Sequence, residues 1–95
     1  MSWFSVKVLY KSEVSDNGSE DKILCEESIF LLQADSLDEA SKKAKTIAVS
    51  NEHNYENDKN ERVSWKYSRL LDIQDLCEDN LYEGVEVYSY MYFQT

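Results

Sequence analysis

The sequence predicts an α+β fold, a two-layer sandwich in which one helix packs on one face of a four-stranded, mainly antiparallel sheet. Four segments alternate apolar and polar residues at a period of two, which is typical of strands. One segment between the second and third of them repeats apolar residues at helical spacing. The chain has 95 residues, no proline and only two glycines, so we expect a single folded domain spanning residues 1–95.

The first two expected strands are the ranges 3–11 and 23–34. One face of the first strand is apolar and is expected to meet the helix; it carries Phe4, Val6, Val8 and Tyr10. The second strand begins with Glu26 and Glu27, which alternation places on opposite faces of the sheet. The intervening range 14–21 is expected to be a loop, because its Asn-Gly pair favours a tight turn.

A helix is expected to begin after Ser36 and to end near Asn51. Ser36 has the composition of an N-cap, and Glu39 three positions later completes the capping-box pattern. The residues expected to face the sheet are Leu37, Ala40, Ala44, Ile47 and Ala48. Because most of them are alanine, we expect the helix to lie close to the sheet.

The third and fourth expected strands are the ranges 63–73 and 85–93, and the range 52–61 before them is expected to be a polar connection. Strict alternation in the third strand places Leu70 on the face away from the helix and leaves Arg69 as the one interruption of the apolar face. The favoured strand order is 2-1-3-4, because it keeps all neighbours antiparallel.

The sheet face away from the helix is expected to be unusually aromatic. Alternation in the fourth strand places Tyr88, Tyr90 and Tyr92 there, together with Trp3 from the first strand. Each aromatic side chain buries ~150–250 Å² when it is covered, so several of them exceed the apolar patch that a small monomer usually exposes. We therefore expect a second copy or another protein to cover this face. The alternative is a solvated face, since antiparallel strands favour tyrosine.

Four segments of the chain together resemble a known family. They are WFSVKVLYKSE, CEESIFLLQADSLDEASKKA, VSWKYSRLLDIQDL and EGVEVYSYMY. These segments are similar to the bacterial domain-of-unknown-function family 4288, whose members are small uncharacterised proteins. The resemblance supports the fold and implies no established activity. It also leads us to expect a glycine before Glu61, where this chain has Asn60, so we expect the turn there to differ.

The chain is strongly acidic, with a formal net charge of -9 from 19 acidic and 10 basic residues. This balance disfavours binding to nucleic acid or to anionic membranes, and it fits a basic protein partner. No apolar run approaches the ~20 residues of a membrane span. The N-terminus also lacks the pattern of a signal peptide. We therefore expect a cytoplasmic protein.

No residue pattern indicates a catalytic, metal or cofactor site. The single histidine, His53, is expected to be a surface residue, because one imidazole beside two unpositioned glutamates is a weak metal signal. Cys25 and Cys77 match neither a metal spacing nor a disulfide framework, so we expect buried free thiols. The acidic run SDNGSED lacks the ligand positions of a calcium loop. We expect no cofactor and no metal.

Three functions remain open. The first is a non-enzymatic acidic binding protein, of the immunity or antitoxin type, that inhibits a basic, nuclease-like toxin through acidic patches at 13–27 and 72–86. The alternative is a homodimeric structural or regulatory module that associates through the tyrosine-rich sheet face. An enzyme would need Glu27 or Glu86 in a pocket, whereas we expect these carboxylates to form cross-strand ion pairs with lysines such as Lys7 or Lys66. The expected partner-binding residues are Trp3, Glu26, Glu27, Leu70, Glu86, Tyr88, Tyr90 and Tyr92.

Overall fold

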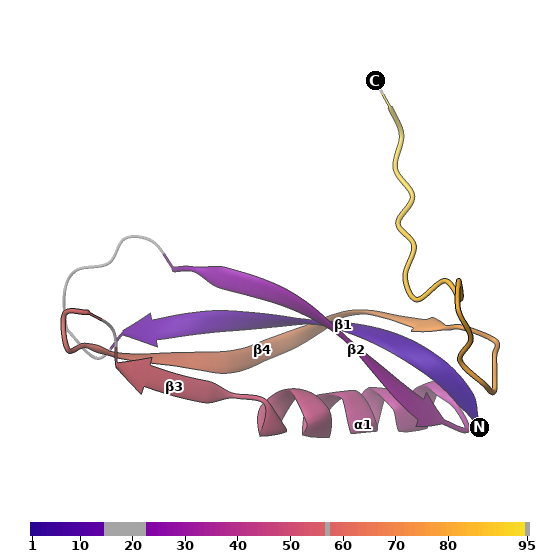
Figure 1. The fold of residues 1–95 in the computed structure, drawn as a ribbon, viewed down its shortest axis with the longest axis horizontal. Coiled ribbons are helices and arrows are strands. Elements are labelled where there is room, and N and C mark those ends of the chain that lie inside the picture. Colours follow the sequence, from indigo (N-terminus) through magenta and orange to yellow (C-terminus); the bar gives the residue numbers. More distant parts are fainter. Residues whose placement is uncertain (15–22, 57, 95) are drawn as a thin grey trace.

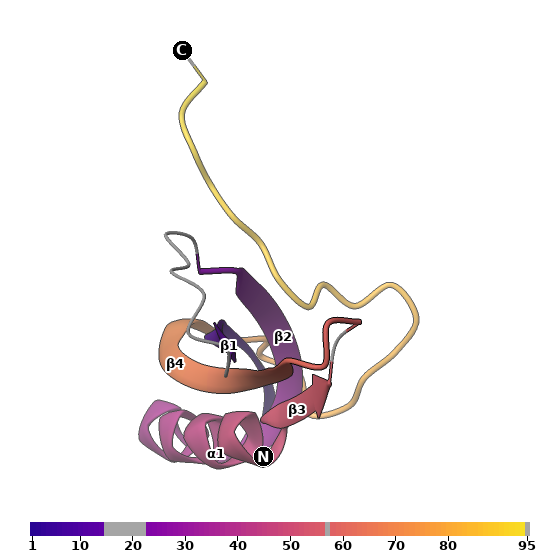
Figure 2. The same ribbon diagram turned by 90° about the vertical axis from the view of Figure 1, so that its left-hand side faces the viewer.

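The computed structural model describes residues 1–14, 23–56 and 58–94. These residues form one helix and one four-stranded antiparallel sheet (Figure 1). The elements are β1 (Ser2–Val14), β2 (Cys25–Ala34), α1 (Leu37–Ser50), β3 (His53–Glu56) and β4 (Arg62–Asp75). The strands lie in the order β2-β1-β4-β3, and α1 covers one face of the sheet (Figure 2). The predicted two-layer α+β sandwich with the element order ββαββ is confirmed.

The fourth strand of the sheet is not the one that the sequence predicted. Residues 85–93 form no strand, and the edge position beside β4 is taken by β3, which lies inside the range expected to be a polar connection. β3 pairs with β4 from His53 opposite Trp65 to Glu56 opposite Arg62. All four side chains of β3 are exposed, so no alternation of apolar residues marks it, and backbone pairing holds it in place. The order of the first three predicted strands matches β2-β1-β4.

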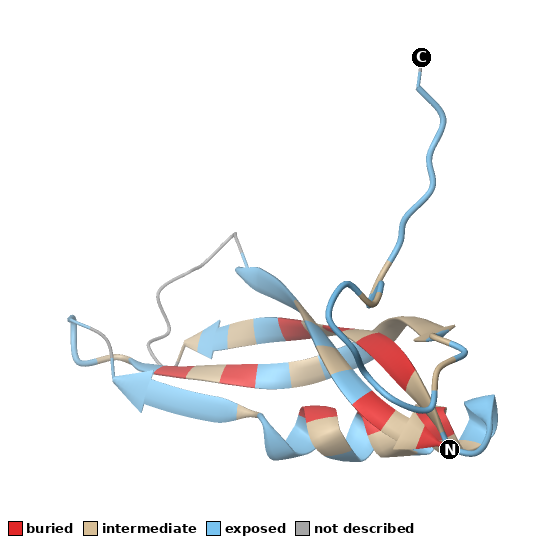
Figure 3. Ribbon diagram, turned by 45° about the vertical axis from the view of Figure 1, so that its right-hand side comes forward, coloured by how far each residue is buried: buried red, intermediate tan, exposed pale blue. Residues whose placement is uncertain are grey.

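The core lies between α1 and the β1 face that alternation predicted. Phe4, Val6, Val8 and Tyr10 are at most 4% exposed (Figure 3). They meet the helix at its three buried alanines, Ala40, Ala44 and Ala48. The Tyr10 hydroxyl donates a hydrogen bond of 2.7 Å to the Ala48 carbonyl, so the only polar atom of this side chain is satisfied where it is buried. Leu37, which was expected to join this stripe, is instead exposed.

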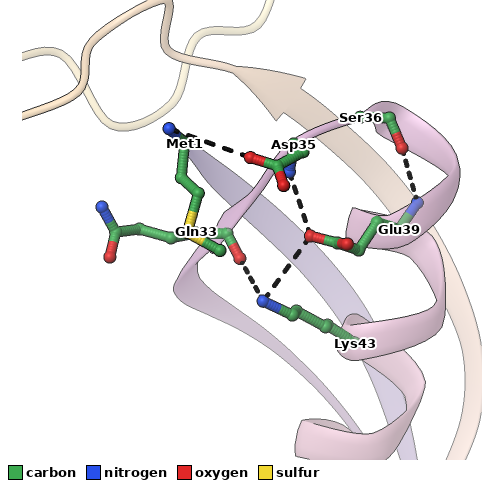
Figure 4. A network of polar contacts seen from close by, with 6 residues as sticks. All are labelled: Met1, Gln33, Asp35, Ser36, Glu39 and Lys43. Carbon is green, nitrogen blue, oxygen red and sulfur yellow. Dashed lines mark hydrogen bonds and ion pairs between the residues drawn. The ribbon is translucent and has the colours of Figure 1, made fainter.

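The start of α1 is fixed by the predicted cap (Figure 4). The Ser36 hydroxyl accepts a hydrogen bond of 3.1 Å from the Glu39 amide, and the Glu39 carboxylate accepts one of 3.0 Å from the Asp35 amide. The carboxylate therefore reaches one residue further back than in the usual capping box. Lys43 lies beside Glu39 and donates to the Gln33 carbonyl at 2.8 Å, which ties the helix to the end of β2.

Two β-bulges in β4 correct the predicted position of Leu70. Asp72 is opposite Lys7 and Leu70 is opposite Val8, so Leu71 between them is an extra residue in β4. In the same way, Arg69 is opposite Leu9 and Tyr67 is opposite Tyr10, so Ser68 is a second extra residue. Each extra residue shifts the alternation of side chains in β4 by one position. Arg69 and Leu70, which lie between the two bulges, therefore exchange faces of the sheet, and beyond the bulges the predicted alternation returns. Leu70 consequently packs against the core clusters.

The same bulges remove the one interruption of the apolar face. They turn Arg69 to the opposite face of the sheet, where it lies across from Leu9 and is exposed. Burial of a guanidinium without a partner is costly, so the bulges exchange an unfavourable core residue for a favourable one. Leu70 is therefore a core residue and not part of an open partner-binding face.

The structure also bears on the two cysteines, the turn at Asn60 and the end of β1. Cys25 and Cys77 are free thiols as expected, but both are exposed. Asn60 has φ 61, in the left-handed region that glycine favours and asparagine tolerates, so an asparagine fits where a glycine was expected. Val14 belongs to β1, and the rest of the predicted loop 14–21 lies outside the described residues.

Within the described part of the chain, no helix has the length and apolar character needed to cross a membrane.

Candidate functional site

The chain after β4 returns across the sheet face opposite α1, which we call the reverse face. The turn is held at its start by Trp3, whose carbonyl accepts from the Leu76 amide at 2.9 Å and whose amide donates to the Glu78 carbonyl at 2.9 Å. Trp3 is half-buried, and its neighbour on the reverse face, Ser5, is fully buried. The reverse face is therefore covered at this end by the chain itself rather than open along its whole length.

Tyr88 occupies the centre of the reverse face without belonging to a strand. Its hydroxyl donates to the Asp72 carboxylate at 2.9 Å, and the Lys7 ammonium lies 5.2 Å from the centre of its ring. Lys7 also forms an ion pair of 2.9 Å with Glu27 on β2. Three strands and the C-terminal segment thus converge on one charged cluster, which we define as Lys7, Glu27, Asp72 and Tyr88.

The residue after Tyr88 is held by a reciprocal pair of hydrogen bonds. The Gln74 side-chain amide donates to the Ser89 carbonyl at 2.8 Å and accepts from the Ser89 amide at 3.2 Å. A side-chain amide that satisfies both backbone groups of one residue replaces the bonds that a neighbouring strand would make. Ser89 is therefore the last point at which these contacts tie the chain to the sheet.

The charges in the cluster stabilise one another. The Tyr88 hydroxyl, aided by the Ile73 amide and Gln74, holds the pKa of Asp72 below its ordinary value. The hydrogen bond from Lys7 to Glu27 raises the pKa of Lys7, against an opposing effect of desolvation. Desolvation and the bond to Asp72 raise the pKa of Tyr88. All three shifts move away from neutral pH, which favours the charged forms of Asp72 and Lys7 and the neutral form of Tyr88 at that pH.

A groove of about 470 Å³ runs beside this cluster. Besides the four cluster residues it is lined by Leu71, the extra residue of one bulge, and by Tyr90. Tyr90 stacks on Tyr92, with ring centroids 6.1 Å apart, and both are largely exposed. The groove combines the apolar side chain of Leu71 with the positive group of Lys7 and the negative groups of Glu27 and Asp72.

The turn between β4 and Tyr88 carries a run of acidic residues that we call the acidic segment, residues 75–86. Its carboxylates are Asp75, Glu78, Asp79, Glu83 and Glu86, and it contains no lysine or arginine. The ion pairs within the described part of the chain involve none of these five. Asp79, Glu83 and Glu86 are exposed. The segment thus presents uncompensated negative charge at one end of the sheet.

The structure separates the predicted site residues. Glu26 and Glu27 lie on opposite faces, as alternation predicted. Glu27 forms the expected ion pair with Lys7, whereas Glu86 lies outside any strand and makes no such pair with a described residue. Glu26 instead lines a pocket of about 240 Å³ on the helix side with Tyr10 and His53.

The three tyrosines also part from one another. Tyr88 does lie on the face away from α1, as predicted. Tyr90 lines the groove beside it but is largely exposed, as is Tyr92. Sequence reasoning placed Asp72 only in the acidic patch 72–86 and missed its contact with Tyr88, and it missed the roles of Gln74 and Ser89. The contact of Asp72 could have been found, because a carboxylate within a predicted strand requires a cation or a hydroxyl close by.

Comparison with known proteins identifies one family. A family model described as "Domain of unknown function (DUF4288)" matches residues 3–89, which extend from Trp3 at the turn to Ser89, the last residue held on the sheet. No curated protein and no solved structure matches significantly. Because the match covers most of the sequence, this chain belongs to the DUF4288 family.

Proposed function

We propose that this protein is a non-enzymatic binding protein that holds a basic protein partner, in the manner of an immunity or antitoxin protein that blocks a nuclease-like toxin. The observation that carries the proposal is the acidic segment, in which five carboxylates face no described cation. Nuclease surfaces attract phosphates, and an acidic protein segment can occupy the same positive surface.

The charge cluster supports binding rather than catalysis. Asp72 is held ionised and Lys7 is held protonated, so neither is near the pKa that a general acid or base requires at neutral pH. Tyr88 donates its hydrogen bond to a carboxylate that is already satisfied by two further donors. These contacts stiffen the segment that follows the acidic residues, and a stiff surface loses less entropy when a partner binds.

Capture from a lysate of the organism that encodes the protein tests the proposal. The test variant carries Asp79→Asn and Glu83→Gln in the acidic segment. The control variant carries Glu56→Gln and Asp58→Asn near the far end of β4, and both variants change the net charge from -9 to -7. We expect the wild type and the control to retain a basic protein, identified by mass spectrometry, that the test variant retains poorly.

The purified partner then allows a kinetic measurement. We expect the test variant to associate at least about fivefold more slowly than the control at low salt, with the difference shrinking as salt rises. A partner with nuclease activity is expected to lose it at a 1:1 ratio with the wild type. Retention of no basic protein, or equal association rates for the two variants, would remove the proposal.

A further inference from the structure

The last residues of the described chain have the composition of a strand but no sheet to join. We call residues 90–94 the tail. Met91 and Phe93 are 93% and 98% exposed, and Tyr90 and Tyr92 are 74% and 78% exposed. Figures 1 and 2 show the tail rising away from both the sheet and α1. Apolar exposure of this extent in consecutive residues marks an interaction site in a small protein.

The tail is also free of the features that keep exposed strands from pairing. From Val87 to Gln94 there is no charged residue, no proline and no glycine, and four of the eight residues are aromatic. Natural edge strands avoid such runs, because unpaired backbone groups beside apolar side chains recruit another strand. The tail therefore needs a strand whose outer edge is free.

The free edge is β2. The Ser12 amide donates to the Leu24 carbonyl, so even-numbered residues of this hairpin bond to β1, and the pairing continues without a shift to Ala34. Odd-numbered residues of β2 consequently point both backbone groups outward. At Gln33 the outward carbonyl is taken by Lys43, as Figure 4 shows.

The remaining outward residues are Cys25, Glu27, Ile29 and Leu31, and no other described backbone group bonds to them from outside. Ile29 and Leu31 are 46% and 38% exposed and lie on the reverse face, where an added strand would place its apolar side chains beside them. On the other side of the sheet, β3 has only four residues and pairs with β4 from Arg62 to Trp65 alone. The rest of the outer side of β4 is a poorer template than β2, because two bulges interrupt it and carboxylates accept from its Tyr67 and Ile73 amides.

We propose that two copies of this chain exchange their tails, each tail adding as a fifth strand to the free edge of β2 in the other copy. Each molecule carries both a tail and a free β2 edge, so a two-fold symmetric dimer pairs both tails with both edges at once. The tail leaves its own sheet at Ser89 and points outward, which favours a second copy over its own edge.

The charge distribution and the size of the contact agree with this occupant. The protein carries a net charge of -9, yet residues 28–34 of β2 and residues 87–94 contain no charge, so two copies meet there without repulsion. Three aromatic residues in each of two tails bury roughly 900–1,500 Å² of tail surface alone, at ~150–250 Å² each. With the surface of the two edges added, the contact reaches the size of a stable interface, about 1,200–2,000 Å². The acidic segment takes no part in it.

Sedimentation equilibrium on matched variants tests the exchange. We expect the wild type to have twice the chain mass of 11.1 kDa. Removal of residues 90–95 leaves the contacts of Ser89 intact and should give a single-chain mass. Ile29→Pro should also give a single-chain mass, because proline removes an outward amide that makes no bond to β1. Ile29→Lys serves as a second edge variant, with a dissociation constant raised at least about 100-fold. Ile23→Lys replaces another exposed isoleucine, which lies before β2, and should remain a dimer.

A mixing experiment separates tail exchange from any other dimer. The truncated chain keeps its edge and the Ile29→Pro chain keeps its tail, so an equimolar mixture should form a heterodimer although each variant alone does not self-associate. The proposal is overturned if the wild type remains a single chain at about 0.5 mM. This includes the case in which the tail amides of that single chain are protected from hydrogen exchange because the tail pairs with its own sheet. A dimer that survives truncation, or a mixture that does not associate, would overturn it equally.

Discussion

Replacement of Leu70 by alanine tests the two bulges on which the assignment of the core depends. Leu70 packs against both core clusters, one around Phe4 and Val6 and the other around Val8 and Trp65. Leu71, its neighbour, lines the groove on the reverse face instead. The Leu71→Ala variant is therefore a matched control, with the same chemical change one residue away on the other side of the strand.

The expected cost follows from the carbon atoms removed. Leucine to alanine deletes three carbons at ~0.8 kcal/mol each, or about 2.4 kcal/mol for a fully buried side chain. Leu70 is only partly buried, which lowers this figure, but it fills space between two clusters that cannot both close over the vacancy. We expect a loss of about 2 kcal/mol for Leu70→Ala and less than about 1 kcal/mol for Leu71→Ala.

Urea unfolding measures the difference. A loss of about 2 kcal/mol lowers the thermal midpoint by roughly 8–16 °C in a domain of this size, and it lowers the urea midpoint without changing the slope. Trp65 is 8% exposed in one of the two clusters, so its fluorescence reports the change directly, and far-UV circular dichroism checks that the fold persists. Equal losses for the two variants, or a loss under about 0.5 kcal/mol for Leu70→Ala, would show that Leu70 lies on the open face and that the bulges are wrong.

Three further substitutions probe single contacts. Tyr10→Phe removes the buried bond to the Ala48 carbonyl and should cost about 1 kcal/mol at pH 8 in urea unfolding. Because burial raises the Tyr10 pKa above its ordinary value of 10.0, the stability tied to its protonated form is complete below that pH and is lost as pH rises through the raised value. The Tyr10→Phe variant should therefore lose less stability than the wild type between about pH 9 and 11. An equal loss in the two proteins over this range would contradict the reasoning. Tyr88→Phe should move the Asp72 pKa up toward its ordinary value, as read from the carboxyl carbon shift in an NMR titration, since the hydroxyl is the main cause of the depression. In the wild type the depressed pKa of Asp72 stabilises the fold at pH values above the pKa of this group in the unfolded chain, and this stability is lost as the pH falls through its pKa in the folded protein. A Tyr88→Phe variant in which Asp72 titrates as it does in the wild type would refute the assignment. Ser36→Ala should cost about 1 kcal/mol and Ser36→Gly only a few tenths, measured by thermal unfolding, whereas two equal small losses would show that the serine does not cap the helix.

The sequence alone determined the elements whose signals are local. Alternation in 3–11 placed Phe4 and Val6 in the core, because the side-chain period of a strand is a property of its own backbone. The Ser36 cap and the end of the helix near Asn51 follow from backbone groups that must be satisfied within a few residues. The ion pair between Lys7 and Glu27 was foreseen for the same reason, since charged residues on neighbouring strands of one face are in reach of each other.

The tertiary structure decided what depends on competition between distant segments. Val85 to Phe93 has the stronger strand pattern, yet β3 takes the edge beside β4, because its residues directly precede the partner strand and pairing requires only a short turn. The bulges that bury Leu70 and release Arg69 arise from the fit of β4 to β1. In the sequence they show only as the interruption at Arg69, which does not reveal that two extra residues flank it. Local alternation can state which side chains share a face, but only the packed sheet determines which strand pairs at each edge, because that choice compares free energies between segments far apart in the chain.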